Sequence, residues 1–398
     1  MRIYALKKPR MLSVAAMLGV FISSVQPSSA ERSDANPSWG DSLAAQVSQD
    51  WADPKYRAFD FWIGEWEMVW RSRAKGSLLF EQSGEAMHHR VFSVLDGKAI
   101  IELAWDPNAE RNRASGRGFS IRYFSDDLNR WVMAQNWPQP GNVGMAFTDQ
   151  LVGVSDHGRQ VMYSTVVQEI EGLEPKTLIR RYNFADIRDG AFRWDGSSSE
   201  DHGERWSTWA VVRANRKRSL DPFGASGEAW PDVSGRNLCT GRPYDQLDKF
   251  EGYWQGTARQ ANRKPIPASL GVGRILDGCG IALSISRADE LNVLKLLSYS
   301  KAMGKWVIYS LDDRRGTTHH YEWAAELASE TVFLHAPDYA IRDEYVAIPH
   351  AKTPNRSLAK KKSSWSASED LGFRMTEYVF EDSQWQFSTE YEFSPTEE

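Results

Sequence analysis

The chain of 398 residues has few of the features that mark common functional classes. Two cysteines are too few for a disulfide-dense scaffold or a cysteine-rich metal site. A formal net charge of −5 and a pI near 6.0 argue against a general nucleic-acid binder. The sequence has no P-loop, no Gly-x-Gly-x-x-Gly, no Gly-x-Ser-x-Gly and no His-Glu-x-x-His. We therefore assign no catalytic residue and no metal ligand from motifs.

Aromatic residues are what the chain has in excess. They make up 12% of the sequence and include 17 tryptophans, within a hydrophobic content of 41%. Disordered chains are poor in aromatic residues, so this composition predicts packed cores. The length suggests about two domains.

The first thirty residues read as a secretory signal peptide rather than as part of the fold. Basic residues precede an uncharged apolar run over 11–25, and Ser28 and Ala30 give the small-residue pattern of a cleavage site. Cleavage near Ala30 would leave a soluble periplasmic or secreted protein; the alternative is an uncleaved anchor. No later run approaches the eighteen apolar residues of a membrane helix, so we expect no membrane span.

The predicted export makes a disulfide between the two cysteines plausible on chemical grounds. Cys239 and Cys279 are the only cysteines, and an even count in an oxidising compartment permits one disulfide. The bridge would close a loop of about 40 residues and could stabilise the chain by a few kcal/mol. The alternative is two separate buried thiols.

The chain contains an internal duplication. Residues 60–66 (DFWIGEW) are echoed by residues 248–254 (DKFEGYW), with an aromatic residue, Gly and Trp at the same spacing. Three further matches follow in the same order: 94–97 with 275–278, 124–132 with 299–307, and 182–186 with 378–382. Four ordered matches predict two related domains.

Composition places the boundaries between these parts. A polar N-terminal arm covers 31–50, the first domain 51–213, and a linker rich in Gly and Pro 214–243. The diverged second domain covers 244–398. Within it, residues 352–364 form a basic segment that we interpret as a solvated loop, with an anionic partner as the alternative.

Short strands dominate the secondary-structure pattern. Segments rich in β-branched and aromatic residues alternate with Gly, Asn and Asp clusters, as in successive hairpins. The predicted strands are 131–137, 161–167, 177–184, 206–212 and 291–299. The best short helix candidates are 43–51 and 321–329. This pattern predicts an all-β sandwich or barrel.

A family resemblance sharpens the fold. Residues 59–67 (FDFWIGEWE) resemble the opening signature of an uncharacterised bacterial family of lipocalin-like barrels, which is similar to calycins and nitrobindin-type haem barrels. Residues 192–206 resemble that family's final hairpin, although His202 stands where Gly is more usual. The resemblance covers about 51–213 and is weaker in the second repeat. It implies two tandem antiparallel lipocalin-like β-barrels, a first-strand Trp closing one end, and no established activity.

Five residues of the first barrel are candidate ligand contacts. Strand alternation places Trp131 and Gln135 on one face and Arg180 with Tyr182 on one face. Inside a barrel, Arg180 and Tyr182 could hold a carboxylate, while Trp66 could line the cavity. The alternatives are a purely structural Trp66 and an outward-facing Arg180.

Histidine placement argues against a cofactor. A haem-binding barrel needs one axial histidine on an inward strand face, and His202 lies in a predicted turn. The adjacent pairs at 88–89 and 319–320 would diverge in strands and could not chelate one metal. We therefore expect no cofactor and keep haem as a minor alternative. Four carboxylates, Glu65, Glu85, Asp96 and Glu102, could supply acid–base chemistry inside a barrel.

These observations favour an exported soluble binding protein. The first barrel would hold a small hydrophobic or amphipathic molecule, and the second would have a structural or partner-docking role. One alternative is an interaction scaffold with filled barrels and a protein partner. The other is a small isomerase or hydrolase that acts inside the first barrel, although an enzyme is the less favoured hypothesis.

Overall fold

The computed structural model describes most of the chain from Asp53 to Pro395. The segments within this span that it does not describe are 74–76, 85, 107–116, 127–128, 137–148, 157, 169–175, 221–238, 277, 290, 301–304, 314–317, 325–329, 337–359, 369–371 and 382–383. The predicted signal peptide, the N-terminal arm and the helix candidate at 43–51 lie outside the described residues. Among the described residues, no helical segment has the length and apolar character needed to cross a membrane.

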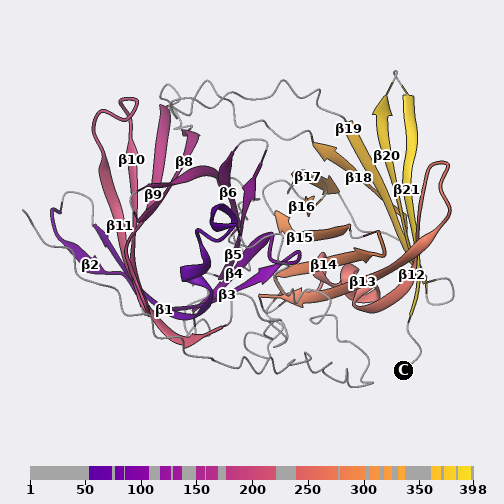
Figure 1. The fold of residues 1–398 in the computed structure, drawn as a ribbon, viewed down its shortest axis with the longest axis horizontal. Helices are drawn as coiled ribbons and strands as arrows, with labels where there is room; N and C mark the ends of the chain where they lie inside the picture. The colour runs from indigo at the N-terminus through magenta and orange to yellow at the C-terminus, as the bar shows by residue number, and fades with distance from the viewer. Residues whose placement is uncertain are drawn as a thin grey trace, which may run out of the picture. The chain divides into compact units, whose positions relative to one another are not determined.

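The first antiparallel ladder, the first barrel, consists of strands β1 to β11 (Figure 1). Its strands are β1 Gly64–Arg73, β2 Phe80–Gln82, β3 Met87–Val94, β4 Ala99–Trp105, β5 Arg117–Ser125, β6 Arg130–Asn136, β7 Asp149–Asp156, β8 Arg159–Gln168, β9 Lys176–Arg188, β10 Ala191–Ser199 and β11 Ser207–Ser219. Strand β11 pairs back onto β1, from Gly64 opposite Ser219 to Ser72 opposite Ala210. This pairing closes the ladder on itself, and β2 is attached to β1.

The second ladder, the second barrel, is a closed antiparallel barrel of strands β12 to β21 (Figure 1). Its strands are β12 Gly252–Gln260, β13 Ile266–Ile275, β14 Gly280–Arg287, β15 Asn292–Ser300, β16 Lys305–Asp312, β17 Thr318–Ala324, β18 Glu330–Ala336, β19 Lys360–Ser368, β20 Gly372–Glu381 and β21 Gln384–Pro395. The predicted all-β fold of two tandem antiparallel barrels is confirmed.

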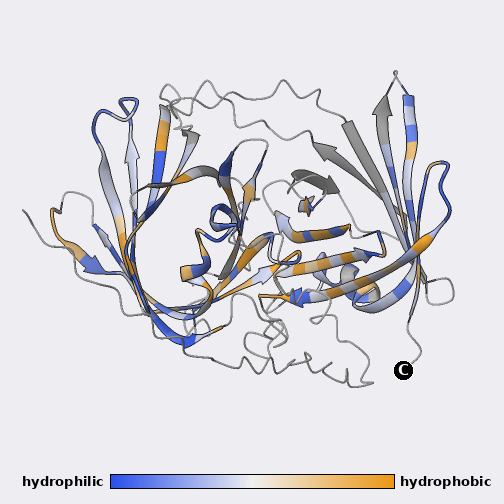
Figure 2. Ribbon diagram, viewed as in Figure 1, coloured by the Kyte–Doolittle hydropathy of each residue, from blue (hydrophilic) through white to orange (hydrophobic). Residues whose placement is uncertain are grey.

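Hydrophobic alternation explains why these segments become strands. Side chains of a strand point to opposite faces in turn, so alternate residues reach the barrel interior. In β1, Trp66 and Met68 are buried while their neighbours are only partly covered. Hydrophobic and hydrophilic bands also alternate along β14 and β15 (Figure 2). Strand β6 is buried on both faces.

The predicted duplication recurs in three dimensions at the start of each ladder. The 3-10 turns η3 (Asp60–Trp62) and η4 (Tyr244–Phe250) precede β1 and β12. The Trp66 indole N–H donates to the carbonyl of Trp62 at 2.6 Å. The Trp254 indole N–H donates to the carbonyl of Phe250 at 3.1 Å, and both contacts span four residues. The two repeats thus begin with the same turn and the same anchored tryptophan.

An aromatic cluster fills one end of the first barrel. The 3-10 turns that precede β1 lie within the ring of its strands (Figure 1). Their rings pack edge-on against the strands, with Phe59 4.9 Å from Trp131 and Trp62 5.3 Å from Phe192 between centroids. We name this cluster the end plug. It comprises Phe59, Phe61, Trp62, Trp66, Phe124, Trp131, Phe184 and Phe192.

The two ladders share buried side chains. One hydrophobic cluster contains Ile121 of β5 together with Leu294 of β15. The Asn136 amide donates to the Ser298 hydroxyl at 2.7 Å within this buried region. The outward face of β4 to β6 is therefore core rather than surface, which explains why β6 is buried on both sides.

Three features of the chain differ from the sequence-based expectation. Strand β11 continues to Ser219, so the predicted linker begins inside a strand. The helix predicted at 321–329 is wrong over Tyr321–Ala324, because these residues belong to β17 and pair with β16 and β18. The basic segment 352–364 was expected to be a loop throughout, but β19 begins at Lys360.

The two cysteines are joined in the structure. Cys239 and Cys279 form a disulfide with an S–S distance of 2.05 Å and a Cα–Cα distance of 5.0 Å. Cys239 lies before η4, and Cys279 lies in the turn between β13 and β14. The bridge therefore ties the entry of the second barrel to its first hairpin.

Candidate ligand-binding interior of the first barrel

Strand register places all five candidate ligand residues on the inner face of the first barrel. Directly opposed residues of neighbouring strands share a face. Trp131 is opposite Gly153, Gly153 is opposite Met162, and Met162 is opposite Tyr182. Trp131 and Tyr182 both belong to the buried cluster that contains Trp66. By alternation, Gln135 and Arg180 share the inner face with Trp131 and Tyr182.

Trp66 and Trp131 are part of the end plug. Both are buried, and each indole N–H has a backbone acceptor: the carbonyl of Trp62 for Trp66 and the carbonyl of Lys55 for Trp131. Their polar atoms are thus engaged in holding the turns before β1. These contacts favour a structural role for the two tryptophans over direct ligand contact.

The other three candidates form a polar group farther along the barrel. The Gln135 amide donates to the Tyr182 hydroxyl at 3.0 Å, which links β6 to β9. Arg180 lies two residues before Tyr182 on the same face and is half-buried. Arg181 lies on the outer face, where its guanidinium sits 4.2 Å from the Trp206 ring centroid. Alternation along β9 therefore sends one arginine inward and the other outward.

A wall of aromatic rings adjoins this polar group. Tyr182 packs 5.0 Å from Trp194, and Trp194 packs 5.6 Å from Trp209 and 5.2 Å from Trp70. A register shift beside Gly196 leaves Trp209 without a directly opposed partner on β10. A side chain at Gly196 would collide with the indoles of Trp194 and Trp209. Trp209 remains 38% exposed although it touches two inward-facing residues.

A second polar group adjoins the end plug. His89 is opposite Trp66 on β1, which places it on the inner face. Its Nδ1 lies 2.6 Å from Glu102 Oε1. The other carboxylate oxygen accepts hydrogen bonds from the Ser120 hydroxyl and from the Arg122 guanidinium, the latter at 2.8 Å. We name His89, Glu102 and Arg122 the polar trio.

The end plug covers the polar trio. The Arg122 guanidinium sits 3.8 Å from the Trp62 ring centroid, a cation–π contact in a desolvated site. All three side chains of the trio are buried. Burial alone raises the pKa of Glu102, but Arg122, His89 and Ser120 outweigh it and lower that pKa to about 2. Burial lowers the pKa of Arg122, and the Glu102 carboxylate opposes this effect.

The ionised carboxylate fixes which ring nitrogen of His89 donates to it. A carboxylate only accepts hydrogen bonds, so Nδ1 of His89 must carry the proton that it donates to Glu102. In the neutral ring, Nε2 then presents a lone pair. This atom is buried and has no hydrogen-bond partner among the described residues. With a neutral imidazole, the trio thus presents one acceptor that has no partner among the described residues.

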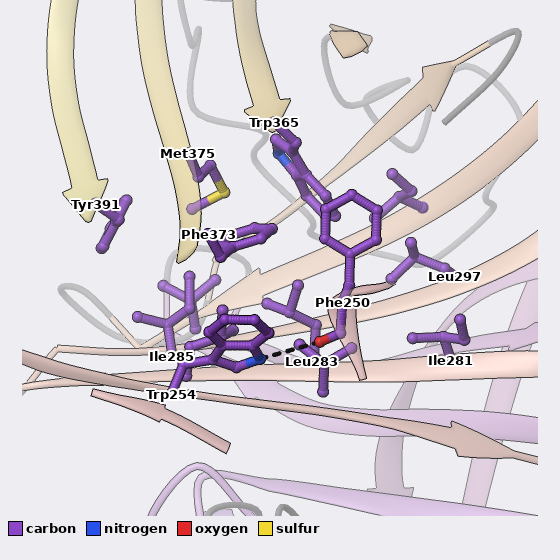
Figure 3. Packing of buried hydrophobic residues seen from close by; sticks show 14 of the residues in the cluster. Phe250, Trp254, Ile281, Leu283, Ile285, Leu297, Trp365, Phe373, Met375 and Tyr391 are labelled. Atoms are coloured by element: carbon purple, nitrogen blue, oxygen red, sulfur yellow. Dashed lines mark hydrogen bonds between the residues drawn. The ribbon is translucent and has the colours of Figure 1, made fainter. Parts of the chain in front are cut away.

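The second barrel provides an internal reference for the polar trio. Trp254 corresponds to Trp66 and is opposite Leu270, where Trp66 is opposite His89. The same registers place Leu283 where the first barrel has Glu102, and Leu297 where it has Arg122. Leu283 and Leu297 lie in the apolar core beside Trp254 and Phe250 (Figure 3). The same architecture is therefore built with three leucines in place of the trio.

The second barrel carries a buried charge directly opposite Leu283, the residue that corresponds to Glu102. Lys295 occupies the register position of Ser120 and is fully buried. Its ammonium lies 3.9 Å from a Glu377 carboxylate oxygen and 5.5 Å from the Trp365 ring centroid. The polar groups of the two interiors thus differ in both position and chemistry.

The structure also locates the predicted acid–base carboxylates and His202. Of the predicted acid–base carboxylates, only Glu102 lies within the barrel: Glu65 pairs with Arg90 and Arg218, Asp96 accepts from Asn292, and Glu85 lies outside the described residues. His202 is exposed in a turn with φ of 57°, the left-handed conformation that explains why Gly is more usual there. It does not lie on an inward strand face, as a haem ligand would require. Within the described ranges, no three His, Cys, Asp or Glu residues are grouped as a metal site.

Sequence reasoning did not identify Ser120 or Arg122 as site residues, and it treated His89 only as one member of an adjacent pair. The signal that could have found them is strand register. Glu102 and Ser120 are opposite one another, and Arg122 follows Ser120 by two positions on the same face. That relation appears only once β4 and β5 are paired.

No protein-family model matches the chain, and no curated protein matches it. The solved structures include a similar chain, a protein of unknown function from the DUF3598 family of Nostoc punctiforme. The similarity has a TM-score of 0.22 and 10% sequence identity, and it covers 86% of this chain and 99% of the other.

Proposed function

We propose that the protein binds a small amphipathic acid inside the first barrel. The observation that carries this proposal is the inward polar group of Gln135, Arg180 and Tyr182 beside an aromatic wall that includes the exposed Trp209. Binding sites for small molecules are mostly apolar and carry a few well-placed polar groups. An open barrel of this size range can enclose one such ligand.

The carboxylate of the ligand would lie against Arg180 and Tyr182. A guanidinium presents a planar fork of N–H donors that matches a carboxylate, and a phenol adds a further donor. The apolar part of the ligand would lie along Trp194 and Trp209, whose rings meet over Gly196. The absence of a side chain at Gly196 leaves room for that aromatic wall.

We also propose that the chain acts after export, in the periplasm or outside the cell. The signal-peptide pattern of residues 1–30 supports this, and so does the Cys239–Cys279 disulfide, since structural disulfides persist in oxidising compartments. N-terminal sequencing of the exported chain tests it. A chain that begins at Glu31 supports export, and an intact Met1 contradicts it.

The binding proposal predicts selectivity for the carboxylate. In titrations followed by tryptophan fluorescence, dodecanoic acid should bind the chain at least about tenfold more tightly than methyl dodecanoate, because only the acid engages the guanidinium. Arg180→Gln should weaken binding of the acid about 10- to 100-fold and leave binding of the ester unchanged.

Arg181→Gln is the matched control for this experiment. It removes the same charge from the next residue of β9, on the outer face beside Trp206. Binding of the acid should change less than about threefold in this variant. Equal affinities for acid and ester, or equal losses in the two arginine variants, would refute the carboxylate clamp.

A further inference from the structure

The polar trio is a costly feature that the barrel itself does not require. Burying charged side chains carries a desolvation penalty, and replacing buried ion pairs by packed apolar residues is often neutral or stabilising. The second barrel makes that replacement with Leu270, Leu283 and Leu297 at the same registers. The trio of the first barrel therefore calls for a role other than stability.

Three side-chain atoms of the trio have no hydrogen-bond partner among the described residues: Nε2 of His89, and Nε and Nη1 of Arg122. Only Nε2 of a neutral His89 can accept a hydrogen bond, because the two Arg122 atoms are donors. Glu102 receives hydrogen bonds on both oxygens, and Arg122 is pressed against Trp62. The carboxylate fixes the tautomer and the ring orientation of His89, as a supporting carboxylate does for a functional histidine. His89 is 2% exposed, and its Nε2 has no partner within the described chain.

Polar residues at neighbouring register positions relate this atom to the proposed carboxylate clamp. Ser120 bonds to Glu102 and is opposite Gln135 across β5 and β6. Gln135 donates to Tyr182, and Arg180 lies two residues from Tyr182 on the same inner face of β9. The acceptor at His89 and the clamp at Arg180 thus belong to one interior.

We propose that His89 Nε2 is a binding subsite for a hydroxyl group, which donates a hydrogen bond to the imidazole. The ligand class is then a hydroxylated amphipathic molecule, with its hydroxyl at the trio and its acid at Arg180. This subsite rests on the proposed function of the first barrel and deepens it. It assigns a second point of recognition and a direction to the ligand.

Phenol and anisole test the subsite without involving the acid clamp. The two probes have similar size, but only phenol can donate a hydrogen bond. Phenol should bind the full chain about tenfold more tightly than anisole, and it should shift the ¹⁵N resonance of His89 Nε2. His89→Leu should abolish this preference, while Arg180→Gln should leave it intact.

A second variant guards against misfolding. His89→Leu leaves Glu102 paired with Arg122. The triple change His89→Leu, Glu102→Leu, Arg122→Leu copies the second barrel at these three positions and removes the charges of the trio together. Both variants should bind phenol and anisole with equal affinity.

Several results would overturn the subsite. They are equal binding of the two probes by the unmodified chain, no binding of phenol, or a preference for phenol that survives His89→Leu. Binding of haemin with a Soret band that His89→Leu removes would assign Nε2 to a metal instead. Failure of the proposed carboxylate clamp is distinguishable from failure of the subsite. It would remove the preference for dodecanoic acid over its methyl ester and leave the preference for phenol over anisole unchanged.

Discussion

At the residue scale, the key interaction is the set of hydrogen bonds that stabilises the buried carboxylate of Glu102. Glu102 is stable as an anion because three side chains from neighbouring strands donate to it. Removing one partner of such a network leaves a buried charge unpaired. This is far more destabilising than replacing the whole network by packed apolar residues. Glu102 thus orients His89 and also anchors Arg122 beneath the end plug.

Replacing Glu102 should destabilise the chain by an amount that depends on pH. Glu102→Gln should lower the free energy of unfolding by about 3 kcal/mol at pH 7, because Arg122 loses its counter-charge. The pKa of Glu102 is lowered to about 2 from its ordinary 4.5, so its contribution is fully present above about pH 4.5. That contribution disappears as the pH falls toward 2, and the difference between variant and unmodified chain should shrink there.

Urea unfolding at pH 7 and pH 3 measures this difference. Glu65→Gln is the control, because Glu65 makes ion pairs at the barrel surface that are worth less than about 1 kcal/mol. A Glu102→Gln chain as stable as the Glu65→Gln chain at pH 7 would contradict the account of the trio.

Sequence reasoning could name residues of the site but not their relations. The shared faces of Trp131 with Gln135 and of Arg180 with Tyr182 follow from alternation, which is local. Which face is inward depends on the register of distant strands. Arg122 and Glu102 are 20 positions apart, and their contact arises only from the pairing of β4 with β5. Sequence alone therefore found Glu102 as a carboxylate without its partners.

At the element scale, the turn before β1 sets the end of the first barrel. Gly64 begins β1 with φ of 144°, and Gly252 begins β12 with φ of 134°. A side chain at Gly64 would also lie 2.7 Å from the Arg218 carbonyl on β11. The glycine of the repeated motif thus permits both the backbone turn and the closing pair β1–β11.

Alanine at Gly64 should therefore weaken closure of the first barrel. Gly64→Ala should lower the free energy of unfolding by about 3 kcal/mol, from backbone strain together with the clash against β11. Gly158→Ala is the matched control, because Gly158 has φ of 75° but no described atom lies within 4 Å of the methyl group that alanine would add. It should cost only about 1 kcal/mol. Thermal unfolding of both variants compares them, and equal losses would count against a role for Gly64 in closure.

Strands were predicted well where hydrophobic alternation is strong and poorly where pairing decides. The segments 161–167 and 177–184 lie within β8 and β9. The helix expected at 321–329 fails because Tyr321–Ala324 pairs on both sides with neighbouring strands. Local propensity is a weak prior that such tertiary pairing overrides. The last residues of β11 were assigned to the linker for the same reason.

At the scale of the whole molecule, one architecture is used twice with different interiors. The order of the repeats and the all-β class follow from the sequence, because aromatic–Gly–Trp and Leu–Asp–Gly motifs recur in order. The different interiors do not follow from it. They become visible only when register matches His89 with Leu270 and Ser120 with Lys295.

Native mass spectrometry of the full chain with dodecanoic acid tests the central claim, that the first barrel alone holds the ligand. We predict one bound acid per chain, with occupancy strongly reduced in Arg180→Gln and retained in Lys295→Met, which removes a buried charge of the second barrel while keeping a similar side-chain volume. No bound acid, two bound acids, or a bound acid that survives Arg180→Gln but disappears in Lys295→Met would contradict the claim.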